Sequence, residues 1–208
     1  MIRLPNNSIL KVHDIFGVIP HFMLQADTIF SDIPYNQSQL SNYSNRPGVY
    51  LSPYNTKKFA DFTNHFFYYV VQIEPTTLFI ETGKEALPDF LITARGLFKY
   101  VTFYNATYYH QPQNKSYIIH ATNDFKRRRY AELEDMDEAE AIAWICNNHP
   151  YKCIGDLCMG QGLVGKHAYL AGKRFVGIDI NPARLQVLAD FIKKEEDRNG
   201  ATPSLDVR

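Results

Sequence analysis

One segment near the end of the chain constrains the fold more than any other. It reads CIGDLCMGQGLVGKHAYLAGKRFVGIDINP, which combines an apolar strand, a glycine-rich turn, a short helix and a second apolar strand. Gly160, Gly162 and Gly165 open the helix, where a backbone without Cβ can turn tightly and approach a ligand closely. Two strands joined through a helix form a βαβ unit. The segment therefore predicts an α/β protein.

Two carboxylates frame the glycine-rich turn. Asp156 ends the first strand four residues before Gly160, and Asp179 ends the second strand 17 residues beyond Gly162. In a βαβ unit the second carboxylate lies where two ribose hydroxyls can donate to it. A dinucleotide and S-adenosylmethionine both carry such a ribose, so the glycines and the acid fit either ligand. They also fit a tight strand-to-helix turn that binds nothing.

Two details favour S-adenosylmethionine over a dinucleotide. Asp156 stands where an acid can receive the ammonium of the methionine part, whereas a dinucleotide fingerprint prefers an apolar strand there. The unit also comes last in the chain, so the other strands of the sheet must come from upstream, as in a circular permutation. A dinucleotide-dependent enzyme stays the alternative, and equilibrium binding of the two ligands would separate them.

The chain upstream of this segment alternates between strand-like and helix-like stretches, the pattern of an α/β fold. Helical spacing of apolar residues predicts a helix that starts at Thr56 and closes at Pro75. Asp137 can start another helix, and Asn181 can cap the last one with Pro182 at its first position. About seven strands are expected, at 9–12, 27–32, 77–81, 99–109, 115–122, 152–158 and 174–180, with shorter helices at 86–98 and 163–172.

The length of the chain predicts one domain over residues 1–208. Residues 36–55 are rich in Ser, Asn, Gln, Tyr, Pro and Gly, so we expect a long loop with no core pattern. Long loops in compact domains are often functional, and this one is expected to face the substrate. Residues 198–208 are expected to form a polar tail.

Charge and cysteine content limit the partners and the compartment. Acidic and basic residues number 22 each, so nucleic-acid binding would need a local patch rather than a bulk field. Cys146, Cys153 and Cys158 are odd in number and lack zinc-finger spacing, which predicts buried thiols in a reducing compartment. The histidines show no ligand spacing, so we expect no metal. With no signal peptide and no membrane-length apolar run, a soluble cytoplasmic protein is expected.

A second motif, FSDIPYN, lies early in the chain. The apolar run TIF stops at Ser31, and Asp32, Ile33, Pro34 and Tyr35 follow. Such a corner can be a plain turn, or a place where a planar ring is held against polar acceptors. On its own the motif favours the turn. Paired with the glycine loop, it favours the functional interpretation.

The pair FSDIPYN and DLCMGQG…FVGIDINPARL resembles the amino-methyltransferases that act on DNA bases, in their permuted (beta-type) arrangement. That family's catalytic motif, Asp/Asn/Ser-Pro-Pro-Tyr/Phe, precedes its cofactor loop, Asp-x-Phe-x-Gly-x-Gly. The stretch HDIFGVIPHFMLQADTIFSDIPYN is also similar to the family's opening. The sequence departs from the pattern at Ile33, where a first proline is usual, at Cys158, where Phe is usual, and at Gln161, where Ser is common. No separate target-recognition domain fits between the motifs.

The resemblance implies a circularly permuted, seven-stranded, Rossmann-like class I methyltransferase fold, with the catalytic half first and the cofactor loop last. It implies S-adenosylmethionine as cofactor and DNA as partner, with RNA still open, and an Asp at position 32 favours adenine N6 over cytosine N4. A homodimer or a separate specificity partner could supply target recognition. The implied cofactor-binding residues are Asp14 (against the adenine), Asp156, Cys158, Gly160, Gly162 and Asp179, and the implied catalytic residues are Asp32, Ile33, Pro34 and Tyr35.

The chemistry of the corner suits that role. An amine conjugated to its ring is a poor nucleophile, and it improves when acceptors hold its hydrogens. The Asp32 carboxylate and the Ile33 carbonyl can supply both acceptors, Pro34 stiffens the corner, and Tyr35 offers a face to a flipped base. A catalytically degenerate binding subunit of the same fold remains the rival of a different class, because a fold does not fix activity.

Two weaker signals concern nucleic-acid contact. The run KRRR at 126–129 could bind phosphates, but acids follow at once, so an internally paired face fits equally well. The tyrosines and asparagines of YNATYYH and SNYSNRPGVYLSPYN suit base stacking, and they suit a half-buried sheet as well.

Overall fold

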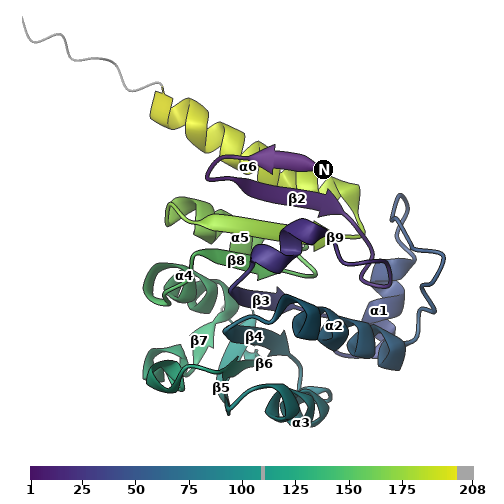
Figure 1. The fold of residues 1–208 in the computed structure, drawn as a ribbon, viewed down its shortest axis with the longest axis vertical. Helices are drawn as coiled ribbons and strands as arrows, with labels where there is room; N and C mark the ends of the chain where they lie inside the picture. Colours follow the sequence, from purple (N-terminus) through teal and green to yellow (C-terminus); the bar gives the residue numbers. More distant parts are fainter. Residues whose placement is uncertain (109–110, 201–208) are drawn as a thin grey trace, which may run out of the picture.

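The computed structural model describes residues 1–108 and 111–200, which form one twisted sheet with helices on both of its faces (Figure 1). The sheet has nine strands in the order β1-β2-β9-β8-β3-β4-β6-β5-β7. The strands are β1 (Ile2–Leu4), β2 (Ser8–Val12), β3 (Thr28–Asp32), β4 (Thr77–Thr82), β5 (Tyr100–Tyr108), β6 (Gln111–Thr122), β7 (Met136–Asp137), β8 (Cys153–Asp156) and β9 (Arg174–Asp179).

The predicted count of seven strands was wrong. The two strands that the sequence did not reveal are β1, with three residues, and β7, with two, and they lie at opposite edges of the sheet. Segments this short are too brief to show the alternation of apolar and polar residues that identifies a strand. Each of the other strands overlaps one of the predicted segments.

Parallel pairing dominates the centre of the sheet. β2 pairs with β9, β9 with β8, β8 with β3 and β3 with β4, all in parallel. β6 runs antiparallel to β4, and β5 runs antiparallel to β6. The five parallel strands therefore all end at the same edge of the sheet, which is where ligands bind in open α/β folds.

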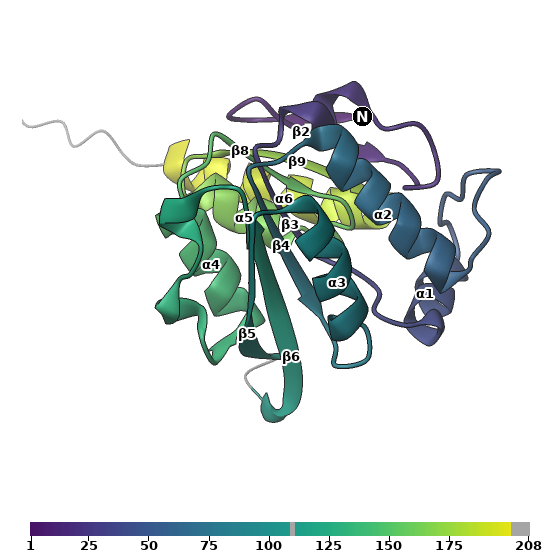
Figure 2. The same cartoon turned by 60° about the horizontal axis from the view of Figure 1, so that its bottom comes forward.

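Two layers of helices bury the two faces of the sheet (Figure 2). Successive strand residues alternate between the faces, so Ile29 joins one hydrophobic cluster and Phe30 joins the other. One face is covered by the 3₁₀ helix η1 (His21–Gln25), α2 (Phe59–Ile73) and α3 (Leu87–Leu97); the other is covered by α4 (Glu138–Asn148), α5 (Leu163–Leu170) and α6 (Pro182–Gly200).

Side-chain caps explain where α4 and α6 begin, at Asp137, which with its neighbours was the predicted start, and at the predicted cap Asn181. The Asp137 side chain accepts the Ala139 N–H, and the Asp137 N–H donates to the Glu140 side chain (3.2 Å each), which is a capping box. The Asn181 side chain accepts the Ala183 N–H (3.0 Å) at the start of α6.

Part of the segment expected as a long loop is helical. The helix α1 (Gln37–Ser44) follows Asn36, whose side chain accepts the Gln39 N–H (2.9 Å). This helix was not predicted because its residues are mostly polar and form no apolar stripe. It buries only Leu40 and Ser44. Between α1 and α2 the chain forms turns without a helix or strand.

Three further expectations concern the chain as a whole. Cys146 and Cys153 are buried free thiols, whereas Cys158 is half-buried. The polar tail was expected from residue 198, but α6 continues to Gly200, and residues 201–208 lie outside the described part of the chain. Among the described residues, no helix is both long and apolar enough to cross a membrane.

Candidate active site

The carboxyl ends of the parallel strands carry acidic side chains. Asp32, Asp156 and Asp179 end β3, β8 and β9. Glu81 is the penultimate residue of β4, and Asp14 follows β2 closely. Since these strands are parallel, all five carboxyl groups lie along one edge of the sheet.

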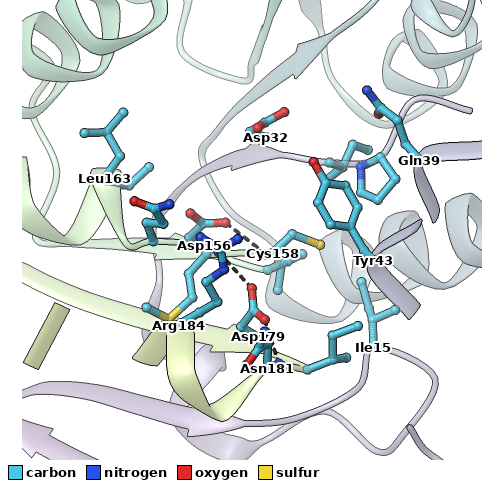
Figure 3. Close-up of a pocket in the computed structure, with 18 of the residues that line it drawn as sticks. Ile15, Asp32, Gln39, Tyr43, Asp156, Cys158, Leu163, Asp179, Asn181 and Arg184 are labelled. Atoms are coloured by element: carbon cyan, nitrogen blue, oxygen red, sulfur yellow. Dashed lines mark hydrogen bonds between the residues drawn. The ribbon is translucent and has the colours of Figure 1, made fainter. Parts of the chain in front are cut away.

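A cavity of about 630 Å³ opens at this edge. Figure 3 shows Asp156, Cys158 and Asp179 close together in it, with Asp32 set apart from them on the strand above. The cavity thus reaches both motifs that the sequence singled out. It is lined by nine of the ten predicted site residues, namely Asp14, Asp32, Ile33, Pro34, Tyr35, Asp156, Cys158, Gly160 and Asp179.

Asp179 fixes the glycine loop from the end of the neighbouring strand. Its Oδ2 atom accepts the Gly160 N–H (2.8 Å), and its Oδ1 atom accepts the Asn181 N–H (2.7 Å) (Figure 3). Burial raises the pKa of Asp179, and the two N–H donors oppose that rise. A carboxylate has about four lone-pair sites, so Asp179 can still accept hydroxyl hydrogens from a ligand.

Gly162 is the predicted site residue that does not line the cavity. Its φ of 75° is left-handed, and a Cβ there would lie 2.8 Å from the Cβ of Leu188 in α6. This glycine is therefore required for the turn and for the close approach of α6. Its neighbour Gly160, with a φ of 48°, faces the cavity.

Asp156 connects the glycine loop to β3. Its Oδ1 atom accepts the Cys158 N–H (3.0 Å), and the Ser31 hydroxyl donates to the same carboxylate while accepting the Leu157 N–H (2.9 Å). Burial raises the pKa of Asp156 to about 8, even though these donors lower it. A nearby cation stabilises the ionised form of such a buried carboxyl, so Asp156 is suited to receiving one at the cavity wall.

Asp14 holds the segment that follows α1. Its Oδ1 atom accepts the Phe16 N–H (3.2 Å), and its Oδ2 atom accepts the Ser52 N–H and the Asn55 side-chain amide (2.7 Å each). Three donors thus use its carboxylate within the protein. The next residue, Ile15, also lines the cavity.

Asp32 faces the cavity from the end of β3. The Asp32 side chain is exposed, but the surface that it exposes faces the cavity. The surrounding protein reduces its contact with bulk solvent, and this desolvation is the main cause that raises its pKa to about 7. The negative charge of Glu138 is the second cause. The Tyr108 hydroxyl donates to its Oδ1 atom (3.3 Å). Beyond Asp32, Ile33 is buried, and the Tyr35 N–H donates to the Gln39 side chain (3.1 Å), which fixes the corner.

Three residues near Asp32 were not predicted: Tyr108 and Glu138, which line the cavity, and Glu81, which is buried beside Asp32 on the next strand. Glu81 had a visible signal, because an acid within the apolar stretch TLFIET must be buried if that stretch is a central strand. Glu138 was not predicted as a site residue because it lies in an acidic run, and such a run suggests exposure to solvent. Tyr108 stood in a strand whose tyrosines suited a half-buried sheet equally well.

The basic run at 126–129 is internally paired, which was one of the two interpretations. Arg127 contacts Asp124 (3.3 Å), and Arg129 contacts Glu134 (3.6 Å). The Arg128 guanidinium lies 4.5 Å from the centre of the Phe125 ring. Three of the run's four cations are thus engaged within the protein.

The segment after α1 offers a different surface beside the cavity. Tyr43 and Arg46 line the cavity, and the guanidinium lies 4.8 Å from the centre of the tyrosine ring. Tyr50 and Tyr54 are exposed in the same segment. Exposed aromatic rings beside cations suit contact with nucleic acid.

In the described part of the chain no group of three or more His, Cys, Asp or Glu side chains could hold a metal ion.

Comparison by sequence finds no matching family model and no matching curated protein. Comparison by structure does find matches. M1.HpyAVI is 14% identical, with a TM-score of 0.60, over 88% of this chain and 98% of that one. TTHA0409 from Thermus thermophilus is also 14% identical, with a TM-score of 0.63, over 90% of this chain and 95% of that one.

A third matching structure is the cytosine-N4-specific PvuII DNA methyltransferase. It is 8% identical, with a TM-score of 0.58, over 92% of each chain. Identities this low show a shared fold, and it extends over nearly the whole of both chains. The α/β fold of this protein is therefore one that a DNA methyltransferase also adopts.

Proposed function

We propose that this protein is an S-adenosylmethionine-dependent methyltransferase that acts on the exocyclic amine of a DNA base, with adenine N6 as the favoured acceptor. One observation carries the proposal. A single cavity is lined both by the glycine-loop residues Asp156, Gly160 and Asp179 and by the corner residues Asp32 and Tyr35. A methyl donor and an acceptor amine can therefore meet in one space.

The structural neighbours support the cofactor and the substrate class. M1.HpyAVI and TTHA0409 have each been solved as complexes with S-adenosylmethionine. PvuII is a DNA methyltransferase specific for cytosine N4. The choice of adenine rests instead on Asp32, which the resemblance in sequence associates with that base.

The order of elements supports the permuted arrangement. β3, with its corner, precedes β8, with its glycine loop, by more than 100 residues in the chain, yet the two strands are hydrogen-bonded neighbours in the sheet. This order is the one that the proposed permutation requires, with the catalytic half first and the cofactor loop last.

The donor groups of the cavity fit S-adenosylmethionine. Asp179 lies at the end of the strand beside the glycine loop, where it can accept the two ribose hydroxyls, and Asp156 can receive the ammonium. Cys158 and Gly160 form the wall between them, and Asp14 fixes the loop around the adenine end. When bound, the cofactor supplies an electrophilic methyl group on a sulfonium.

The corner residues have separate roles in the proposed reaction. Asp32 and the Ile33 carbonyl accept the hydrogens of the amine and draw its nitrogen toward tetrahedral geometry. Pro34 limits the flexibility of the corner, and Tyr35 stacks on the base that has left the duplex. The transfer is a direct displacement without a covalent enzyme intermediate, so alignment of the two reactants carries most of the catalysis.

We propose that the substrate approaches past α1 and the segment after it. Tyr43 and Arg46 line the cavity there, and Tyr50 and Tyr54 are exposed in the same segment, so they can stack on bases and contact phosphates. We propose that a homodimer or a separate specificity partner supplies the sequence recognition, because no separate target-recognition domain fits between the two motifs.

The direct test is incubation with labelled S-adenosylmethionine and DNA, followed by digestion and analysis of the nucleosides. We expect label in N6-methyladenine. Label in N4-methylcytosine would keep the reaction and change the base. Binding of the cofactor and of DNA without transfer would identify a binding subunit, and binding of a nicotinamide or flavin dinucleotide instead would overturn the proposal.

A further inference from the structure

Two more carboxyl groups lie next to Asp32, and the proposed reaction has not used them. Asp32 in β3 and Glu81 in β4 are register partners on adjacent parallel strands, so their side chains leave the sheet on the same face. Glu138 lines the cavity together with Asp32 and Tyr108. Three acids from three different elements thus lie together at the amine end of the cavity, where Asp32 and Glu138 line it and Glu81 is buried beside them.

Glu81 is completely buried, and its surroundings favour the protonated form. Its Oε1 atom accepts the Ser116 hydroxyl (2.8 Å), whereas its Oε2 atom accepts from no donor in the described part of the chain. The group hydrogen-bonded to the Glu81 carboxyl on its other side is the Glu138 carboxyl. Two carboxylates can share a hydrogen bond only if one is protonated, and burial, then the charges of Asp32 and Glu138, raise the pKa of Glu81 well above its usual range.

Glu138 is the acceptor of that pair. It is the first residue of α4, directly after the capping residue Asp137, and the N-terminus of a helix favours a negative charge. Burial raises the pKa of Glu138, but the hydrogen bond from Glu81 lowers it. The hydrogen bond raises the pKa of the fully buried Glu81 and lowers that of Glu138, so we assign the shared proton to Glu81 and the acceptor role to Glu138 at the cavity.

We propose that Glu138 is a second catalytic carboxylate, which lies with Asp32 against the amine, and that Glu81 is the positioning residue that holds it there. This proposal rests on the proposed methyl transfer. In that reaction the nitrogen lone pair forms the bond to the methyl carbon, while the carbon–sulfur bond breaks and its electron pair stays on sulfur. The nitrogen becomes cationic and then loses one proton to Asp32 or Glu138.

A second carboxylate lowers the barrier because positive charge develops on the amine nitrogen in the transition state, next to the carboxylate. Fixed charges aimed at a developing charge are among the largest catalytic terms in a site that excludes water. Among the described residues, the titratable groups that interact with Asp32 are Glu81, Tyr108, Glu138 and Asp156. The cations Arg46, Lys166 and Arg184 line the same cavity.

The first test is Glu138→Gln, which keeps the shape and removes the charge. Wild-type activity should rise with pH as Asp32 ionises near its pKa of about 7. With the neighbouring charge removed, Asp32 ionises more easily, so we expect this rise at lower pH, with a plateau of kcat about ten- to hundredfold lower. The KM for DNA should change little. Glu132→Gln, at an exposed position outside the cavity, removes the same charge and should match the wild type.

The second test separates the roles of Glu81. In Glu81→Gln the amide can still donate to Glu138, so the rate and its pH profile should stay close to wild type. In Glu81→Met, which has a similar volume and no donor, kcat should fall while binding of S-adenosylhomocysteine is kept. The inference is overturned if Glu138→Gln has the wild-type plateau and pH profile, or if the two Glu81 variants behave alike in the folded protein. Absence of methyl transfer by the wild type would instead contradict the proposed function.

Discussion

Asp156 is the residue whose charge should depend most directly on the cofactor. In the free protein its pKa is about 8, chiefly because of burial, so most of it is protonated at neutral pH. Binding of an ammonium requires the ionised form. We therefore predict that affinity for S-adenosylhomocysteine, which carries the same amino group, rises from pH 6.5 toward about pH 8 and then levels off. Calorimetric titration at several pH values measures this dependence.

Asp156→Asn is the matched variant for that measurement. It keeps the size of the side chain and removes the titration, so affinity should be lower and should no longer follow pH in this range. A wild-type affinity that does not change with pH would show that Asp156 does not receive the ammonium.

Asp179 should contribute to binding rather than to the methyl-transfer step. A carboxylate that accepts hydroxyl hydrogens contributes about 1.5–3 kcal/mol for each charged hydrogen bond. Asp179→Ala should therefore weaken cofactor binding at least about tenfold, while circular dichroism shows a folded protein. Unchanged affinity in a folded variant would remove Asp179 from the ribose site.

Single residues were predicted from sequence where a motif made their chemistry visible. Asp32 and Asp156 follow apolar strands directly, so their position at the sheet edge could be deduced. Glu81 and Glu138 could not be connected in this way, because they are far apart in sequence and meet only through the pairing of β4 beside β3 and the packing of α4. Their contact depends on the tertiary structure.

At the scale of elements, the turn between β8 and α5 depends on Gly162. Alanine there would need a left-handed φ of 75° and would place a Cβ 2.8 Å from Leu188. We predict that Gly162→Ala lowers the free energy of unfolding by about 1–3 kcal/mol, from backbone strain and overpacking together. Urea denaturation measures the loss.

Gly96→Ala is the control for this prediction. Gly96 lies in α3, has no unusual φ, and has no neighbour within 4 Å of an added Cβ. Alanine there should leave stability unchanged or raise it by up to about 1 kcal/mol. Equal effects of the two substitutions would mean that the turn does not require glycine at position 162.

The segment after α1 should be held at defined points rather than freely mobile. The Ser52 N–H donates to Asp14, and the Tyr50 N–H donates to the Ile180 carbonyl (2.7 Å each). We predict slow hydrogen exchange at both amides without DNA. Asp14→Asn should speed exchange at Ser52 and leave Tyr50 protected, because only the first loses a charged acceptor. Equally fast exchange at both amides in the wild type would contradict this account.

The success of prediction differed among elements for physical reasons. α2 was evident because its buried phenylalanines recur at helical spacing. α1 was missed because a helix that packs through Leu40 and depends on an Asn36 cap leaves no apolar stripe in the sequence. The edge strands β1 and β7 were missed because they are short and form only by pairing with β2 and β5, which the local sequence of each does not indicate.

At the scale of the whole molecule, the α/β class and the strands of the central sheet followed from sequence, but the order of the strands did not. Nothing local to FSDIPYN indicates that its strand pairs with the strand of the glycine loop. The sheet makes that pairing between β3 and β8, and it brings the two motifs to one cavity. The proposed function depends on this long-range pairing as much as on either motif.

Asp32→Ala tests the central claim most directly, in a single-turnover reaction with labelled S-adenosylmethionine and DNA both saturating. The carboxylate is proposed to touch only the amine, so its loss should appear in the chemical step. We predict transfer about a hundred- to thousandfold slower than wild type, with cofactor affinity nearly unchanged. Wild-type transfer by Asp32→Ala would mean that the corner is only a turn, and it would contradict the account.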